Sequence, residues 1–169
     1  MIKFNIHITY SVILTFIYGC GIYSFSGTSI AEEIKTASIN YIKNEAKLIQ
    51  PNLSTLITEK LITKCQIEAN LLASTDPGGD ISFYGKIINY TISPVAINST
   101  EQATQNRLTI TVEMIFINKF NDKENFNKTF SQYTDFNSND NFSDLEEELC
   151  KVIVDDLIDD IFNFALVSW

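Results

Sequence analysis

Histidine, arginine and cysteine are scarce in this 169-residue chain, and each shortage narrows the range of functions. His7 is the single histidine, and it lies in an N-terminal segment that we expect to be removed. The remaining protein would have no histidine, which excludes Ser-His-Asp and Cys-His catalysis and histidine-ligated zinc. The cysteines are Cys20, Cys65 and Cys150, too few and too widely spaced for a cysteine-cage metal site. No metal and no cofactor is expected.

Basic residues are also few. The chain has 12 Lys and Arg against 21 Asp and Glu, a formal net charge of −9, and Arg107 is its single arginine. An acidic domain repels the phosphate backbone, so no nucleic-acid partner is expected.

The chain lacks an apolar run long enough to span a bilayer. Its longest candidate, Ile8–Tyr18, matches the ~7–15 residues of a signal-peptide core and falls short of the ~18 of a membrane span. Gly19 and Cys20 follow, and a small residue before cysteine at this place is typical of a bacterial lipoprotein cleavage site. Residues 1–19 are therefore predicted to be a signal peptide, with acyl chains such as palmitate added to Cys20 to anchor the protein to a membrane.

Cleavage removes Lys3, so 150 of the 169 residues remain and the charge falls from −9 to −10. The alternative is an uncleaved N-terminal anchor with a chance cysteine. Residues 20–30 are interpreted as a lipidated tether, although their alternating large residues also fit the start of a strand. Residues 31–169 have the size of one domain with one core.

Alternation with a period of two predicts strands, and helical spacing of apolar residues predicts two amphipathic helices. The predicted strands are Lys35–Ile42, Ile81–Ile97, Arg107–Asn118 and Phe126–Phe136; the helices run from Leu53 to before Asp76 and from Ser143 onward. The clearest signal is an unbroken apolar face of Leu108, Ile110, Val112, Met114 and Phe116, opposite Arg107, Thr109, Thr111 and Glu113.

Finer details also follow from the pattern. In the first strand, Ala37, Ile39 and Tyr41 share one side, and in the first helix Thr58 faces outward. In the long strand the alternation changes phase, and Gly85 is predicted to form a bulge there.

Proline and capping residues place the ends of these elements. Pro94 indicates a sheet edge. Asn52 is predicted to cap the first helix, while Ser143 and Glu146 have the spacing of a capping box at the second.

These elements predict an α+β fold. It is a two-layer α/β sandwich, in which two helices cover one face of a mostly antiparallel sheet of about four strands.

Three other features allow a functional and a structural interpretation. The acidic residues of the last helix would suit acid–base chemistry or calcium binding. The interpretation we favour is that they form the solvent-exposed face of the helix. The segment Asp76–Asp80 lacks the lysine and helix of a phosphate loop and is predicted to be a turn. Cys65 and Cys150 lie on two helices of one layer, so either a disulfide or two buried thiols is compatible with the pattern.

Arg107 is the strongest candidate for a binding residue. It begins the best strand, on the side away from the core, and Lys86 and Lys119 are placed on neighbouring strands. These three cations, with Thr109 and Thr111 on the same side, are predicted to contact a ligand or partner, and Arg107 is able to hold a phosphate. The alternative is an ion pair between Arg107 and a nearby carboxylate.

Several stretches resemble one family. They are the run Cys20–Gly27, the turn Gly78–Asp80 before a long strand, the strand segment Asn106–Val112, and Asp160–Asn163 near a C-terminal Trp169. In this order and spacing they are similar to the lipopolysaccharide-assembly lipoproteins of the LptE/RlpB family, and the likeness covers nearly all of the chain that remains after cleavage before Cys20.

The resemblance implies a non-enzymatic lipoprotein on the periplasmic side of the outer membrane of a Gram-negative envelope. It further implies a plug inside the LptD β-barrel that assists lipopolysaccharide transport, with lipopolysaccharide itself as a second ligand. The alternative is a lipoprotein of the same compartment that binds another amphiphile or assists another envelope complex. A barrel partner predicts a broad polar and apolar sheet face, whereas a carrier predicts a deep apolar cavity.

Overall fold

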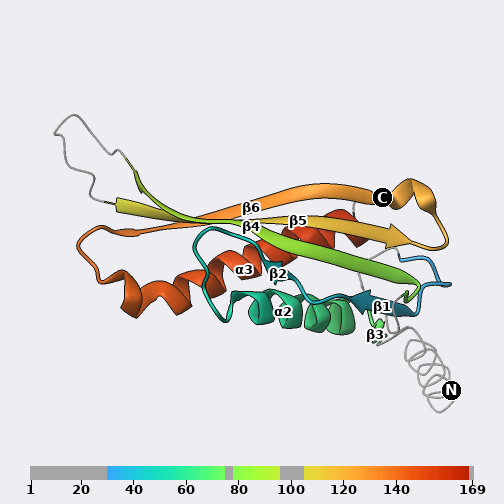
Figure 1. The fold of residues 1–169 in the computed structure, drawn as a ribbon. Coiled ribbons are helices and arrows are strands. Elements are labelled where there is room, and N and C mark those ends of the chain that lie inside the picture. The colour runs from blue at the N-terminus through green and yellow to red at the C-terminus, as the bar shows by residue number, and fades with distance from the viewer. Residues whose placement is uncertain (1–29, 75–77, 96–104, 168–169) are drawn as a thin grey trace, which may run out of the picture.

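A computed structural model describes residues 30–74, 78–95 and 105–167. These residues form two layers, one a β-sheet and the other a pair of α-helices (Figure 1). The elements in chain order are β1 (Thr36–Ile39), β2 (Lys43–Asn44), α2 (Leu53–Glu68), β3 (Leu72–Ala73), β4 (Ile81–Val95), β5 (Gln105–Asn118), the short 3-10 helix η2 (Asp122–Glu124), β6 (Phe126–Asn137) and α3 (Phe142–Leu166). The predicted signal peptide, Cys20 and the tether up to residue 29 lie outside the described residues.

Within the described residues the sheet has six strands rather than about four, and it is mixed. Its order is β3-β1-β4-β5-β6, with β2 also paired to β4. β1 runs parallel to both β3 and β4, whereas β4, β5 and β6 form an antiparallel meander. Parallel neighbours need a crossover of a dozen or more residues, which α2 provides. The two added strands escaped prediction because two residues carry no alternation.

The first predicted strand is shorter than expected and is interrupted. β1 ends at Ile39, and the chain rejoins β4 only at Lys43. Ala37 is buried as predicted, but Tyr41 is 57% exposed and Ile42 is fully buried. The alternation changes phase here because the chain leaves the ladder after Asn40, whose N–H still donates to Phe83 O (2.9 Å).

The long antiparallel strands match their predictions closely. Every predicted core residue of β5 is buried, and η2 forms the predicted connection to β6. Pro94 pairs with Asn106 of β5, and no described strand lies on its other side, so it is at an edge.

The predicted bulge at Gly85 is wrong. The register shifts between Ile87 and Asn89, and Gly85 itself pairs regularly with Met114. A Cβ atom at Gly85 would lie 2.3 Å from Met114 Sδ. Glycine is therefore present to let the Met114 side chain pack under the sheet.

α2 begins after Asn52 as predicted, although the Asn52 side chain makes no capping hydrogen bond. Thr58 is buried and does not face outward. Its hydroxyl accepts a hydrogen bond from Ile42 N–H (3.1 Å) and donates one to Ser54 O (2.7 Å). A threonine in the apolar stripe therefore satisfies the backbone where the first strand is interrupted.

α3 begins one residue earlier than predicted. Asn141, rather than Ser143, is its N-cap, and its side-chain oxygen accepts a hydrogen bond from Ser143 N–H (3.3 Å). The apolar arc from Cys150 to Ala165 is buried against the sheet as predicted.

Both helices lie on the same face of the sheet and run in the same direction (Figure 1). Ion pairs fix their relative register, since Lys60 contacts Asp155 and Lys64 contacts Asp159 (2.8 Å). By this register Cys150 lies about ten residues from the level of Cys65, or roughly 15 Å along the helix axes. That distance exceeds the ~7 Å limit for a disulfide. The structure accordingly has two buried free thiols, and burial raises the pKa of Cys65 to about 12.

Candidate functional site

The sheet face opposite the helices is covered by no described element (Figure 1). The pairing register places alternate residues of three strands there, and from Tyr84 of β4 onward they are at least partly exposed. We call this surface the open face; it consists of Tyr84, Lys86, Asn89, Thr91 and Ser93 of β4, Arg107, Thr109, Thr111, Glu113 and Ile115 of β5, and Asn127, Thr129, Ser131, Tyr133 and Asp135 of β6.

Hydroxyl and amide groups dominate the centre of the open face. Thr111 and Ser131 share a hydrogen bond between their hydroxyls (2.9 Å), and Asn89 Nδ2 donates to Thr91 Oγ1 (3.2 Å). Apolar surface is added by Ile115, which is 40% exposed, and by Tyr133, which is 51% exposed. The face therefore combines polar and apolar groups without a strong charge.

Arg107 lies at one end of the open face and is held by its own neighbours. Its Nε and Nη2 donate to the two oxygens of Asp135 (2.7 and 3.0 Å), directly opposite on β6. The guanidinium carbon also lies 3.6 Å from the centre of the Tyr133 ring. These hydrogen bonds lower the pKa of Asp135 and raise the pKa of Arg107. The structure thus forms the ion pair that the sequence left as the alternative.

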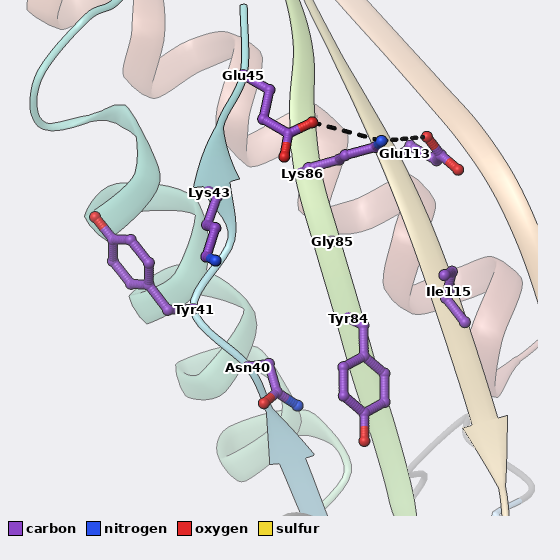
Figure 2. A pocket seen from close by; sticks show the side chains of 9 residues that line it. All are labelled: Asn40, Tyr41, Lys43, Glu45, Tyr84, Gly85, Lys86, Glu113 and Ile115. Carbon is purple, nitrogen blue, oxygen red and sulfur yellow. Dashed lines mark ion pairs between the residues drawn. The ribbon is translucent and has the colours of Figure 1, made fainter.

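Lys86 lies in a hollow of about 530 Å³ on the open face (Figure 2). Its Nζ is 3.5 Å from a carboxylate oxygen of Glu113 on β5 and equally far from one of Glu45, just after β2. The negative charges of Glu113 and Glu45 raise the pKa of Lys86. The lining is completed by Asn40, Tyr41, Lys43, Tyr84, Gly85 and Ile115.

The hollow forms where the first strand is interrupted. Asn40 and Tyr41 bring the chain out of the ladder, and Tyr84 and Lys86 of β4 line the hollow beside them (Figure 2). Two lysines and two glutamates line it, so its formal charge is zero.

Lys119 is separate from the other two cations. It follows β5 at the end opposite Arg107, about 40 Å away along the strand, and its ammonium donates to Gly78 O. The structure therefore places Thr109 and Thr111 between Arg107 and Lys86 on one face, but it does not bring the three cations into one site.

The sequence did not identify the tyrosines or Glu45 as parts of the site. Tyr84 and Glu113 each lie next to a core residue in a regularly alternating strand, so their position on the face away from the core was predictable. Tyr41 and Glu45 reach the hollow only because the first strand breaks, and no residue pattern marks that break.

No metal-binding group of three or more His, Cys, Asp or Glu side chains occurs in the described residues. None of the helices within those residues is long and apolar enough to cross a membrane.

The family model for LptE, described as lipopolysaccharide-assembly, matches residues 34–164. The chain belongs to the LptE family. This match covers every strand and both α-helices that the structure describes, except the last residues of α3. Among curated proteins, none matches the sequence.

Solved structures resemble this LptE-family chain in fold. The hypothetical protein CT253 of Chlamydia trachomatis has a TM-score of 0.52 at 9% identity, over 78% of this chain and 97% of that one. An uncharacterized lipoprotein B from Nitrosomonas europaea also has a TM-score of 0.52, at 12% identity over 76% and 79%. A minor lipoprotein from Acinetobacter baumannii is 20% identical, with a TM-score of 0.46 over 76% and 90%.

Proposed function

We propose that this protein is an outer-membrane lipoprotein, anchored through Cys20 on the periplasmic side, that forms a plug or scaffold complex with an LptD-type β-barrel. In that complex it assists the transport and assembly of lipopolysaccharide without catalysing a reaction. The observation that carries the proposal is the open face, an uncovered sheet surface in a chain of the LptE family.

The chemistry of the open face suits a barrel wall better than a lipid chain. The interior of a large outer-membrane barrel is polar. The open face offers hydroxyls, amides and ion pairs, with Ile115 and the tyrosines adding apolar contact. A carrier of an amphiphile would need a deep apolar cavity, whereas four charged side chains line the 530 Å³ hollow.

The predicted contact residues have different roles in this proposal. Thr109 and Thr111 supply flat polar contact at the centre of the open face. Arg107 and Lys86 present charges already paired with carboxylates, so they would set alignment with the barrel more than hold a free phosphate. Lys119, far from both, would contact the partner only at the end of β5.

Membrane anchoring and barrel binding are tested separately. Metabolic labelling with a fatty acid is expected to mark the wild-type protein and not Cys20→Ser. Equal label in both would contradict anchoring through this cysteine.

For the barrel, tagged protein is purified from outer membranes and its partners are identified. Thr111→Lys, at the centre of the open face, is expected to lose LptD, because a long charged side chain would hold the two surfaces apart. Thr55→Lys, on the exposed side of α2, is the matched control and is expected to retain it. Loss in neither variant, or recovery of a different envelope complex with the wild type, would contradict the proposal.

A further inference from the structure

Exposed apolar residues from several segments gather at one end of the molecule. Figure 1 shows that α2, β5 and α3 finish at the end where β1 begins. We call this end the entry end, because the described chain enters the domain here. Its exposed apolar residues are Ile67 (75% exposed), Leu72 (70%), Phe120 (54%) and Val167 (40%). They belong to α2, β3, the turn after β5 and the end of α3, so packing rather than a local pattern brings them to one place.

Strand pairing fixes the level of these residues across the sheet. Leu72 pairs with Thr36, whose N–H donates to a carboxylate oxygen of Asp80 (2.8 Å). The N–H of Lys119 donates to Asp80 O (3.0 Å), and Phe120 follows Lys119 directly. The row therefore crosses β3, β1, β4 and the end of β5, which is three strand spacings or about 14 Å.

The polar groups of the entry end are largely engaged within the fold. Asp80 accepts hydrogen bonds from two backbone N–H groups, Glu124 accepts from the side-chain amides of two asparagines, and the Lys119 ammonium donates to a backbone oxygen. Glu32 and Glu33 are exposed nearby, so charges of both signs are present. A partner of this end would thus be held by apolar contact more than by charge.

Exposed side chains farther from the entry end supply a comparison. The connection between β6 and α3 at the opposite end, residues 138–141, is Ser-Asn-Asp-Asn. Leu48 and Ile49 are apolar and exposed, but they precede the sixteen residues of α2, a helix about 24 Å long. Ile49 is as exposed as the apolar residues of the entry end, at a different level of the molecule.

The length of chain before the domain indicates what lies beside the entry end. Cys20 is ten residues before Ile30, so the chain between them spans at most about 36 Å. The fourteen residues of β5 cover about 45 Å from one end of the sheet to the other. An acyl chain on Cys20 would therefore keep the entry end close to the membrane, whereas the opposite end could lie far from it.

We propose that the entry end docks onto the lipid surface that holds the acyl chains of Cys20, with Ile67, Leu72 and Phe120 entering its headgroup region. Apolar side chains that insert at this depth add to the affinity given by an acyl anchor. This inference rests on the anchoring step of the proposed function.

The docking is compatible with a plug inside a barrel. The apolar band of a barrel is only about 25 Å tall, whereas β5 alone covers about 45 Å. A plug whose strands follow the barrel axis therefore extends beyond the wall, and the tether holds the entry end on the anchored side.

Fluorescence in vesicles tests the proposal. The full-length lipidated protein is reconstituted in phosphatidylcholine vesicles with a polarity-sensitive dye on one introduced cysteine, since the native thiols of Cys65 and Cys150 are buried and should not react. We expect a dye at Phe120→Cys to emit at shorter wavelength and to lose most of its emission to a quencher carried on the lipid. Dyes at Ile49→Cys and Asn139→Cys should do neither.

A second pair of variants tests the contribution of Phe120 itself. A dye at Leu72→Cys is expected to be quenched from the lipid, to lose that quenching when Phe120→Asp is added, and to keep it when Ile49→Asp is added. Both positions are exposed, so both aspartate variants should melt like the wild type. Salt should change the quenching little, because the contact is apolar.

Flotation of the same vesicles measures anchoring separately. A wild type that floats but gives equal dye signals at positions 120 and 49 would overturn the docking and leave the anchor intact. A wild type that does not float would overturn both. A dye shift at position 120 that appears only when LptD is present would show that the entry end binds the barrel instead of lipid.

Discussion

The two faces of β5 illustrate how one strand divides its residues between folding and recognition. Leu108, Ile110, Val112 and Met114 are fully buried under the helices, while Thr109 and Thr111 alternate with them on the open face. A period of two is sufficient for this division. One face is made of apolar side chains that contact each other, and the other of polar groups that can contact a second surface.

The largest effect is expected from a charge on the covered face. Val112→Asp places an unpaired carboxylate in the core, at a cost of several kcal/mol, out of a total stability of about 5–15 kcal/mol. Thr111→Asp, its neighbour on the open face, should melt close to the wild type. If the two variants had the same melting temperature, the assignment of Val112 to the buried face and Thr111 to the open face of β5 would be wrong.

A smaller loss is expected from Thr58→Val. The substitution preserves shape but removes the hydroxyl that accepts a hydrogen bond from Ile42 N–H. An unsatisfied buried donor costs about 1–3 kcal/mol, which chemical denaturation would detect. Thr55→Val, three residues earlier on the exposed side of α2, is the matched control and should change little.

Next in size is the effect of Asp80, which fastens β1 to β4. Its Oδ2 accepts hydrogen bonds from the N–H groups of Lys35 and Thr36 (2.8 Å each). These bonds, with the Lys35 backbone contributing most, lower the pKa of Asp80. The carboxylate therefore stabilises the fold at pH values above its unfolded pKa of about 3.9, and this contribution is lost as the pH falls through the lower folded pKa.

Asp80→Asn should cost about 1 kcal/mol at neutral pH, because the site is only partly buried and solvent screens its charge. The variant should also lose part of the acid dependence of unfolding. Unfolding curves for wild type and variant with the same slope below pH 4 would contradict this role.

The smallest effect on folding is expected at Arg107. Its pair with Asp135 is exposed, and exposed pairs contribute little to stability. Arg107→Glu should melt near the wild type but weaken association with the barrel, measured by pull-down. A large drop in melting temperature would show instead that Arg107 mainly stabilises the folded state.

The sequence predicted the parts of the fold that have long, regular patterns. The core of β5, the β5–β6 hairpin and both amphipathic helices follow directly from residue spacing. The bulge was misplaced because Ile87, Ile88 and Tyr90 are all apolar, and side-chain chemistry does not reveal which of them leaves the ladder. β2 and β3 were missed because each has only two residues, and its pairing, of β2 with β4 and of β3 with β1, is set by tertiary structure.

The candidate site was predicted in part for the same reason. Thr109, Thr111 and Arg107 were placed on the correct face by alternation alone. The pairing of Arg107 with Asp135 depends on the register of β5 against β6, and the hollow at Lys86 depends on where the first strand breaks. Such contacts between distant segments are set by packing rather than by local pattern.

Site-specific photo-cross-linking in cells tests the central claim most directly. A photoreactive residue is placed at Thr109 or Thr111 on the open face, and at Thr55 or Asp156 on the exposed sides of the helices. We expect adducts with LptD from the two positions on β5 and none from the two helical positions. Adducts only from the helices, or none with LptD from any position, would contradict it.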